Sequence, residues 1–138
     1  MKIGFIGAGT VARTFCRHLT AGHTVVVSNS RGPETPTRFI AELGPNAIAG
    51  MKQQAAECDV VILATNWVNV AEALKGVNWR GRILIDATNA HMDPKPDISL
   101  AGIIRSRAAL KGRTSSEIVA EKAVLASKAE LPISSFAS

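Results

Sequence analysis

The stretch "KIGFIGAGTVARTFCRHLTAG", residues 2–22, decides the fold that we predict for this chain. Its first five residues are mostly apolar, as in a short buried strand, and they run directly into a glycine-rich turn. After the turn, Val11, Phe15 and Leu19 recur at helical spacing until Gly22 ends the pattern. The sequence therefore predicts a strand, a tight turn and a helix in immediate succession.

The turn itself has the spacing G-x-G-x-x-A, formed by Gly7, Gly9 and Ala12. In the Rossmann fingerprint the first glycine permits the tight turn, and the second lets a pyrophosphate approach the backbone. The small third residue lets the helix press on the sheet. Free amides at the start of the helix, together with its dipole, favour phosphate at this point. We therefore predict a dinucleotide-binding turn, with a turn that serves only packing as the alternative.

The rest of the chain continues the alternation of strands and helices. Further strands are expected at residues 23–30, 46–50, 59–65 and 81–89, and helices at residues 33–43, 67–75 and 113–131. In residues 67–75 the apolar face comprises Val68, Ala71 and Leu74, and residues 98–110 have mixed character. This pattern predicts an α/β protein, with a doubly wound parallel sheet and an NAD(P)-binding Rossmann fold.

The end of the chain is organised around one long helix. Thr114 and Glu117 have the spacing of a capping box that opens this helix. We expect residues 1–121 to form the nucleotide-binding domain and residues 122–138 to supply the end of the helix and a tail of uncertain role. The last residues, "LPISSFAS", either add a sixth strand or fray.

Composition limits the classes of function. The chain has 138 residues, of which 46% are hydrophobic and 20% charged, and no apolar run approaches the roughly 20 residues that cross a bilayer. The net charge of +5 comes from scattered bases, with only 4% aromatics, which disfavours a nucleic-acid surface. Cys16 and Cys58 are expected to be buried and reduced, and we predict no metal site. No secretory signal follows Met1, so we expect a cytoplasmic protein without membrane contact.

The second strand ends in "SNSR", where NAD-specific proteins place an Asp or Glu on the ribose hydroxyls. A carboxylate would repel the additional phosphate of NADP. Ser28, Asn29 and Ser30 instead offer uncharged donors, and Arg31 adds a permanent cation. We therefore predict a site for NADP(H), with a merely polar loop as the alternative.

Polar residues also follow the fourth and fifth strands, on the edge where such sheets bind ligands. They are Thr65, Asn66, Trp67, Asp86, Thr88 and Asn89. Two alternatives stay open, because Asp86 is equally suited to a structural role and Trp67 to the core. His91 is the histidine to test for proton transfer. No catalytic triad or carboxylate pair is evident, and the chain has no tyrosine; we therefore name no catalytic residue.

The stretches "IGFIGAGTVA", "SNSRGPE", "ILATNW" and "DATNA" together resemble the coenzyme F420-dependent NADP oxidoreductase family, over residues 1–121. The resemblance implies an NADP(H)-binding domain that exchanges hydride with a small-molecule acceptor, a deazaflavin such as F420 or a flavin. It places Thr10 and Val11 with Gly9 at the pyrophosphate, and residues 28–31 at the adenosine phosphate. Near the nicotinamide it places Ala64, Thr65, Asn66, Trp67 and Asn89.

The sequence departs from the family pattern at two loops and at its end. Asn66 and Ala90 stand where family members often have proline. Family chains usually continue for many residues beyond the length of this one, into a region that helps to build the acceptor site and often a dimer. Two functions are therefore expected: an NADPH-dependent oxidoreductase, with homodimerisation permitted, or a non-catalytic NADP(H)-binding module that needs a partner chain.

Overall fold

The computed structural model describes residues 1–30, 32, 37–90 and 99–129. In this part of the chain, five parallel strands form one sheet in the order β3-β2-β1-β4-β5. The strands are β1 (Lys2–Ile6), β2 (Thr24–Ser28), β3 (Ala47–Ala49), β4 (Val60–Leu63) and β5 (Ile83–Asp86). The predicted α/β class and doubly wound parallel sheet are thus confirmed.

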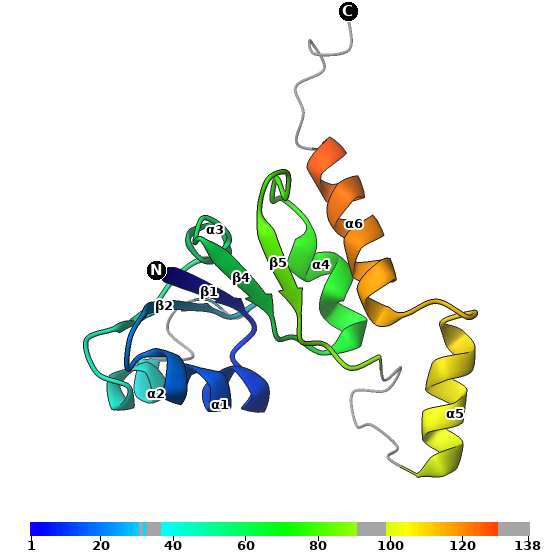
Figure 1. The fold of residues 1–138 in the computed structure, drawn as a ribbon, viewed down its shortest axis with the longest axis horizontal. Helices are drawn as coiled ribbons and strands as arrows, with labels where there is room; N and C mark the ends of the chain where they lie inside the picture. The colour runs from blue at the N-terminus through cyan, green and yellow to red at the C-terminus, as the bar shows by residue number, and fades with distance from the viewer. Residues whose placement is uncertain (31, 33–36, 91–98, 130–138) are drawn as a thin grey trace, which may run out of the picture.

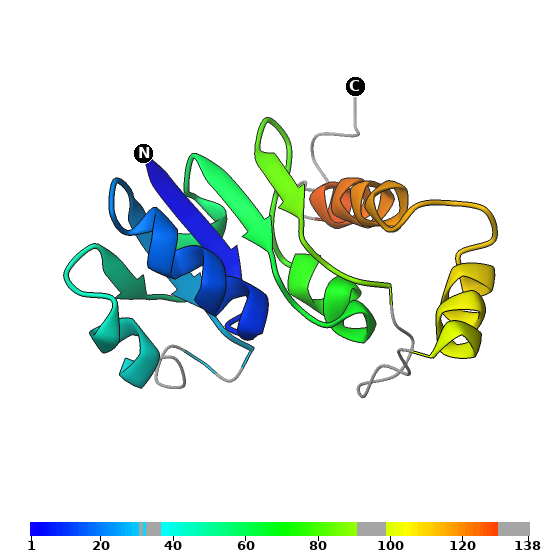
Figure 2. The same cartoon turned by 60° about the horizontal axis from the view of Figure 1, so that its bottom comes forward.

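Helices cover both faces of the sheet (Figures 1 and 2). On one face lie α1 (Thr10–Leu19) and α2 (Thr37–Glu42), and on the other lie α3 (Lys52–Ala56), α4 (Val70–Leu74) and α6 (Ser115–Ala129). A 3-10 turn, η1 (Trp67–Asn69), precedes α4. The remaining helix, α5 (Leu100–Ala109), lies beyond the β5 edge of the sheet, at the opposite end of the molecule from α2.

Strand alternation divides the buried side chains into two cores. Phe5 of β1 is aligned with Ile62 of β4, and both pack beneath α1 and α2. The next pair in the register, Ile6 and Leu63, points to the other face, where it packs with Leu74 of α4. Because the three central strands are covered on both sides, they read as continuous apolar runs in the sequence.

Gly4 explains how closely α3 approaches the sheet. A Cβ at this position of β1 would collide with the carbonyl oxygen of Ala55 in α3. A glycine within a strand often marks such a close approach of another backbone. This packing role is separate from the glycine-rich turn that follows β1.

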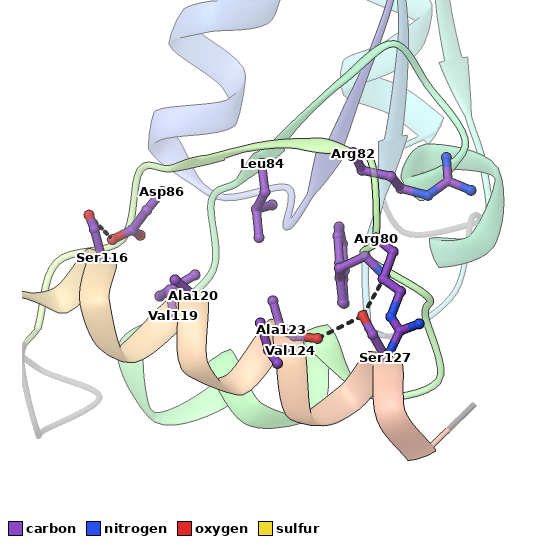
Figure 3. A pocket seen from close by; sticks show the side chains of 11 residues that line it. Arg80, Arg82, Leu84, Asp86, Ser116, Val119, Ala120, Ala123, Val124 and Ser127 are labelled. Atoms are coloured by element: carbon purple, nitrogen blue, oxygen red, sulfur yellow. Dashed lines mark hydrogen bonds between the residues drawn. The ribbon is translucent and has the colours of Figure 1, made fainter. Parts of the chain in front are cut away.

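The long terminal helix begins as the sequence predicts. The Glu117 carboxylate accepts from the Thr114 amide at 2.7 Å, while the Thr114 hydroxyl accepts from the Glu117 amide at 3.2 Å. Near its other end, the buried Ser127 hydroxyl accepts from the Trp79 amide at 2.7 Å and donates to the Ala123 carbonyl at 2.9 Å (Figure 3). Residue 121 lies inside α6, and the proposed division of the chain there stays a prediction.

The apolar face expected for residues 67–75 is partly wrong. Val68 is 49% exposed, whereas Val70 and Leu74 are buried. The reason is that residues 67–69 form a 3-10 turn with a tighter period, so the α-helical spacing starts only at Val70. The mixed segment at residues 98–110 contains α5, in which Ser99 caps the helix by accepting from the Gly102 amide.

On α1 the buried face is formed by small side chains. Ala12 and Cys16 are fully buried, while Val11 and Phe15 are 42% and 49% exposed. The small residues let α1 lie close to the sheet, as the fingerprint requires of Ala12. Among the residues that the structure describes, no helix is both long and apolar enough to cross a bilayer.

Candidate cofactor-binding site

The carboxyl ends of the parallel strands bring the predicted site segments to one edge of the sheet. The Gly7 amide donates to the Ser28 carbonyl at 2.9 Å, which joins the ends of β1 and β2. The Ala64 amide donates to the Ile6 carbonyl at 2.9 Å and joins β4 to β1 on the other side. The strand order reverses between β1 and β4, which is the point where open α/β sheets bind their ligands.

Gly7 turns the chain directly after β1, and no other residue fits there. Its φ is +112°, a conformation that side chains rarely adopt, and an added Cβ would collide with the carbonyl of Ala64. The turn from β1 into α1 therefore lies against the end of β4, as the fingerprint predicts.

The N-terminus of α1 is open to a ligand. Gly9 is the N-cap and has no side-chain cap bond, and the first turn contains no acidic residue. The first helical bond runs from the Arg13 amide to the Gly9 carbonyl, so the amides of Thr10 and Val11 have no intrahelical partner. A Cβ on Gly9 would meet nothing within 4 Å, and Thr10 and Val11 are exposed. Such a terminus suits a phosphate.

A cavity of about 320 Å³ lies beside this turn. It contains four predicted site residues: Gly7, Ser28, Asn29 and Ser30. The other lining residues are Ile6, Gly32, Met51, Lys52, Gln53, Asn69, Glu72 and Ala73. Arg31, the predicted cation of the site, lies outside the described residues. The structure therefore gathers the ends of β1 and β2 with the starts of α3 and α4 around one space.

Ser28 has a more specific geometry than its sequence position indicates. Its side chain is 2% exposed, and its hydroxyl donates to the Phe5 carbonyl at 2.9 Å. Because a hydroxyl has one proton, this bond leaves only acceptor capacity toward the cavity. Asn29 is half-buried and Ser30 exposed. The Ser30 hydroxyl donates to Asn29 Oδ1 at 3.4 Å, so the side-chain amide of Asn29 is the donor left for a ligand.

Lys52 is a cavity residue that the sequence analysis missed. Its ammonium donates to the carbonyl oxygens of Lys75 at 2.5 Å and Glu72 at 3.3 Å, near the end of α4. It therefore places a positive charge in the cavity wall, between α3 and the end of α4. Lys52 could have been found from the sequence, because it follows the third strand closely and therefore lies at the edge of the sheet that binds ligands.

The residues predicted near the nicotinamide fall into two groups. Ala64 is buried, Thr65 is half-buried, and Asn66 is the exposed N-cap of η1. Trp67 is half-buried and packs against the core, as the structural alternative expected. Asn89 lies past β5 and lines a separate cavity of about 440 Å³.

Asp86 at the end of β5 is engaged with α6. One carboxylate oxygen accepts from the Thr88 amide at 2.9 Å and the Thr88 hydroxyl at 2.6 Å. The other accepts from the Ser116 hydroxyl at 2.9 Å, the bond that Figure 3 shows. Burial raises the pKa of this carboxyl, but the hydrogen bonds outweigh that effect, so the pKa lies below its ordinary value. Asp86 is thus a structural carboxylate that joins the end of β5 to the first turn of α6.

Neither cysteine is suited to thiol chemistry. Both are free and buried, and burial raises the pKa of the Cys16 thiol to about 12. Burial, with Asp59 adding to it, also raises the pKa of Cys58. The described residues contain no group of three or more His, Cys, Asp or Glu that could hold a metal ion. His91, the histidine suggested for proton transfer, lies outside the described residues.

A third cavity, of about 380 Å³, lies between β5 and α6 (Figure 3). Leu84 of β5 faces Val119, Ala123 and Val124 of α6, and Arg80 lies at one end. The β5 strand pairs only with β4 in the described sheet. This groove belongs to the β5 edge, and among the described residues expected at the ligand edge, Asp86 is the one that lines it.

Comparison with known proteins places this geometry in a family. The sequence profile described as "NADP oxidoreductase coenzyme F420-dependent" matches residues 2–90. A probable 3-hydroxyisobutyrate dehydrogenase-like 1 protein, mitochondrial, from Arabidopsis thaliana is 28% identical over 115 residues, which cover 76% of this chain and 34% of that protein.

A solved structure shares this fold. The hypothetical protein SMa0349 from Sinorhizobium meliloti is 32% identical, with a TM-score of 0.72 over 89% of this chain and 57% of that one. The chain thus spans about a third of the length of the curated relative and somewhat over half of the solved one. The fold, the glycine turn and the profile match agree: this chain belongs to the coenzyme F420-dependent NADP oxidoreductase family and forms its NADP-binding, Rossmann-like domain.

Proposed function

We propose that this chain binds NADP(H) across the ends of β1, β2 and β4 and transfers hydride between the nicotinamide and a flavin or deazaflavin acceptor. Two neighbouring features carry the proposal. The N-terminus of α1 has no side-chain cap, and the cavity beside the Gly7 turn is lined by Asn29 and Ser30. The end of β2 has no carboxylate at the position where NAD-specific proteins place one. The family match supports NADP(H) as the nucleotide.

The residues present fit this nucleotide. The amides at Thr10 and Val11 are free for the pyrophosphate, and the open space at Gly9 admits it. The cavity beyond them offers the side-chain amide of Asn29 and the positive charge of the Lys52 ammonium, which also donates to two backbone carbonyls. Arg31 is proposed to add the cation that pairs with the adenosine phosphate.

The chemistry requires little of the protein beyond positioning. When bound, NADPH would supply a hydride to the acceptor, which would also take up one proton from the solvent, so that NADP⁺ and the reduced acceptor are formed. Ala64, Thr65 and Asn66 at the end of β4 are proposed to hold the nicotinamide. Asp86 keeps its carboxylate committed to Thr88 and Ser116, so it does not serve as a proton donor. Hydride exchange between two bound ring systems does not need a proton-donating side chain.

The test is to mix the NADPH complex with FMN or a deazaflavin and to follow the nicotinamide absorbance. The proposal expects NADPH oxidation that depends on both protein and acceptor. Gly9→Asp is the control, because its carboxylate would occupy the place of the pyrophosphate and should abolish the reaction. If NADPH binds and no acceptor oxidises it, the chain is instead an NADP(H)-binding module.

A further inference from the structure

The cavity of about 440 Å³ lies at the carboxyl end of β5, beside the predicted nicotinamide region. Thr88 and Asn89 form the β5 side, and Ile103, Ser106, Arg107 and Leu110 come from α5 and its C-terminal end. Two segments distant in sequence thus enclose a space whose volume lies in the range of small-molecule sites. Asn89 belongs both to this cavity and to the residues proposed to lie near the nicotinamide.

Arg107 is the cation of this cavity. It lies in the last turn of α5, and α5 has no acid in its first turn and none in its sequence. Among the described residues, the Arg107 guanidinium has no ion pair or hydrogen bond, whereas the backbone carbonyl of this residue accepts from the Leu110 amide. Arg113, six residues later, differs in this respect, because it pairs with Glu121 at 2.5 Å. A guanidinium without a partner at a cavity wall is suited to an anionic ligand group.

The described lining of this cavity contains no carboxylate that would compete for Arg107. Asp86 ends β5, but it lines the other groove and its oxygens accept from Thr88 and Ser116. The rest of the cavity is mixed: Ile103 and Leu110 offer apolar contact, and the Ser106 and Thr88 hydroxyls offer hydrogen bonds. Such a wall suits a planar ring with polar edges and one anionic substituent.

We infer that this cavity binds the hydride acceptor, and that Arg107 recognises an anionic group, a phosphate or carboxylate, on that acceptor. The inference rests on the proposed function, because it needs the nicotinamide at the ends of β4 and β5. It adds the chemical class of the acceptor: a ring compound with an acidic substituent is bound in preference to the same ring without it.

FMN and riboflavin test this directly, because they share one ring system and differ in a single phosphate. Flavin fluorescence is titrated with the NADP-saturated protein, and FMN is expected to bind about 10- to 100-fold more tightly than riboflavin. Arg107→Ala should remove this preference by weakening FMN alone, and Arg107→Lys should restore part of it. Arg17→Ala is the matched control, since Arg17 is exposed in the last turn of α1.

Equal affinity for the two flavins, an unchanged preference in Arg107→Ala, or binding of neither flavin would overturn the inference. Circular dichroism of each variant shows whether its fold is retained. NADPH oxidation in the same samples separates the two proposals. FMN binding that depends on Arg107 without NADPH oxidation leaves the cavity assignment standing and contradicts hydride transfer. NADPH oxidation with the same KM for FMN in the wild type and in Arg107→Ala would support hydride transfer and contradict the role of Arg107.

Discussion

The Ser28 hydroxyl donates a hydrogen bond to the carbonyl oxygen of Phe5, 2.9 Å away on the neighbouring strand. This bond fixes the end of β2 against β1 at the point where the cofactor cavity begins. It also commits the single proton of Ser28, so recognition of an anion is left to the residues that follow it. The sequence position of Ser28 predicts its place in the site, and the structure assigns it to the support of the site.

Ser28→Ala should therefore affect stability more than nucleotide specificity. Loss of one buried neutral hydrogen bond is expected to lower the free energy of unfolding by about 0.5–1.5 kcal/mol. The ratio of NADPH to NADH affinity should remain within about threefold of the wild type, since the Phe5 bond gives no donor to the ligand. Urea unfolding and fluorescence titration measure the two effects. A collapse of the affinity ratio at unchanged stability would contradict this assignment.

Gly7→Ala should destabilise the fold and abolish nucleotide binding together. The substitution combines a Cβ collision with Ala64 and a positive φ, and a strained backbone position costs on the order of 1–3 kcal/mol. Gly22→Ala is the matched control, because its Cβ would meet nothing within 4 Å and its φ is not positive. Thermal unfolding compares them, and equal midpoints for the two variants would sink the prediction.

Asp86 should make the stability that comes from the packing of α6 on β5 depend on pH. Its pKa is lower in the fold than in the unfolded chain, so its stabilising contribution is complete above the unfolded value of about 3.9. That contribution is lost as the pH falls through the folded pKa. Asp86→Asn is therefore expected to lower the midpoint of unfolding at pH 7, with the difference from wild type vanishing in stronger acid. Circular dichroism between pH 2 and pH 7 measures it.

A matched control for this pH series is Glu42→Gln, which removes one carboxylate from the exposed end of α2. Its midpoint should follow that of the wild type across the whole range. An Asp86→Asn difference that stayed constant down to the lowest pH would mean that the ionised carboxylate does not hold α6.

Ser127→Ala should be more costly than Ser116→Ala, although both lie on α6. Ser127 is 2% exposed and accepts from the Trp79 amide, so its removal leaves a buried donor without a partner. Such a donor costs about 1–3 kcal/mol. Ser116 is exposed, and water can replace its bond to Asp86. Denaturant unfolding measures the loss of unfolding free energy in each variant. A larger loss in Ser116→Ala than in Ser127→Ala would contradict the prediction and mean that α6 is held mainly at its first turn.

Much of this architecture could be predicted from the sequence because local signals and the global pattern agree. The continuous apolar strands require cover on both faces, and the Gly7 to Ala12 spacing requires a strand before it and a helix after it. The capping box of Thr114 and Glu117 could be predicted because both partners lie within one turn of the same helix.

What could not be predicted depends on contacts between distant segments. The burial of Val70 in place of Val68 follows from a 3-10 turn, which residues 67–75 do not signal in their spacing. The Ser28 hydroxyl could have turned toward a ligand, and only the position of the Phe5 carbonyl decides otherwise. Lys52 and Arg107 reach their cavities because α3 and α5 bring them there, which no motif records.

The central claim, a site built for the additional phosphate of NADP, is tested most directly by equilibrium titration of the protein with NADPH and NADH under the same conditions. The account predicts that NADPH binds at least about 10-fold more tightly. Arg31→Ala and the isosteric Asn29→Asp should each weaken NADPH by about that factor and leave NADH nearly unchanged. Equal affinities for the two nucleotides in the wild-type protein would contradict the claim.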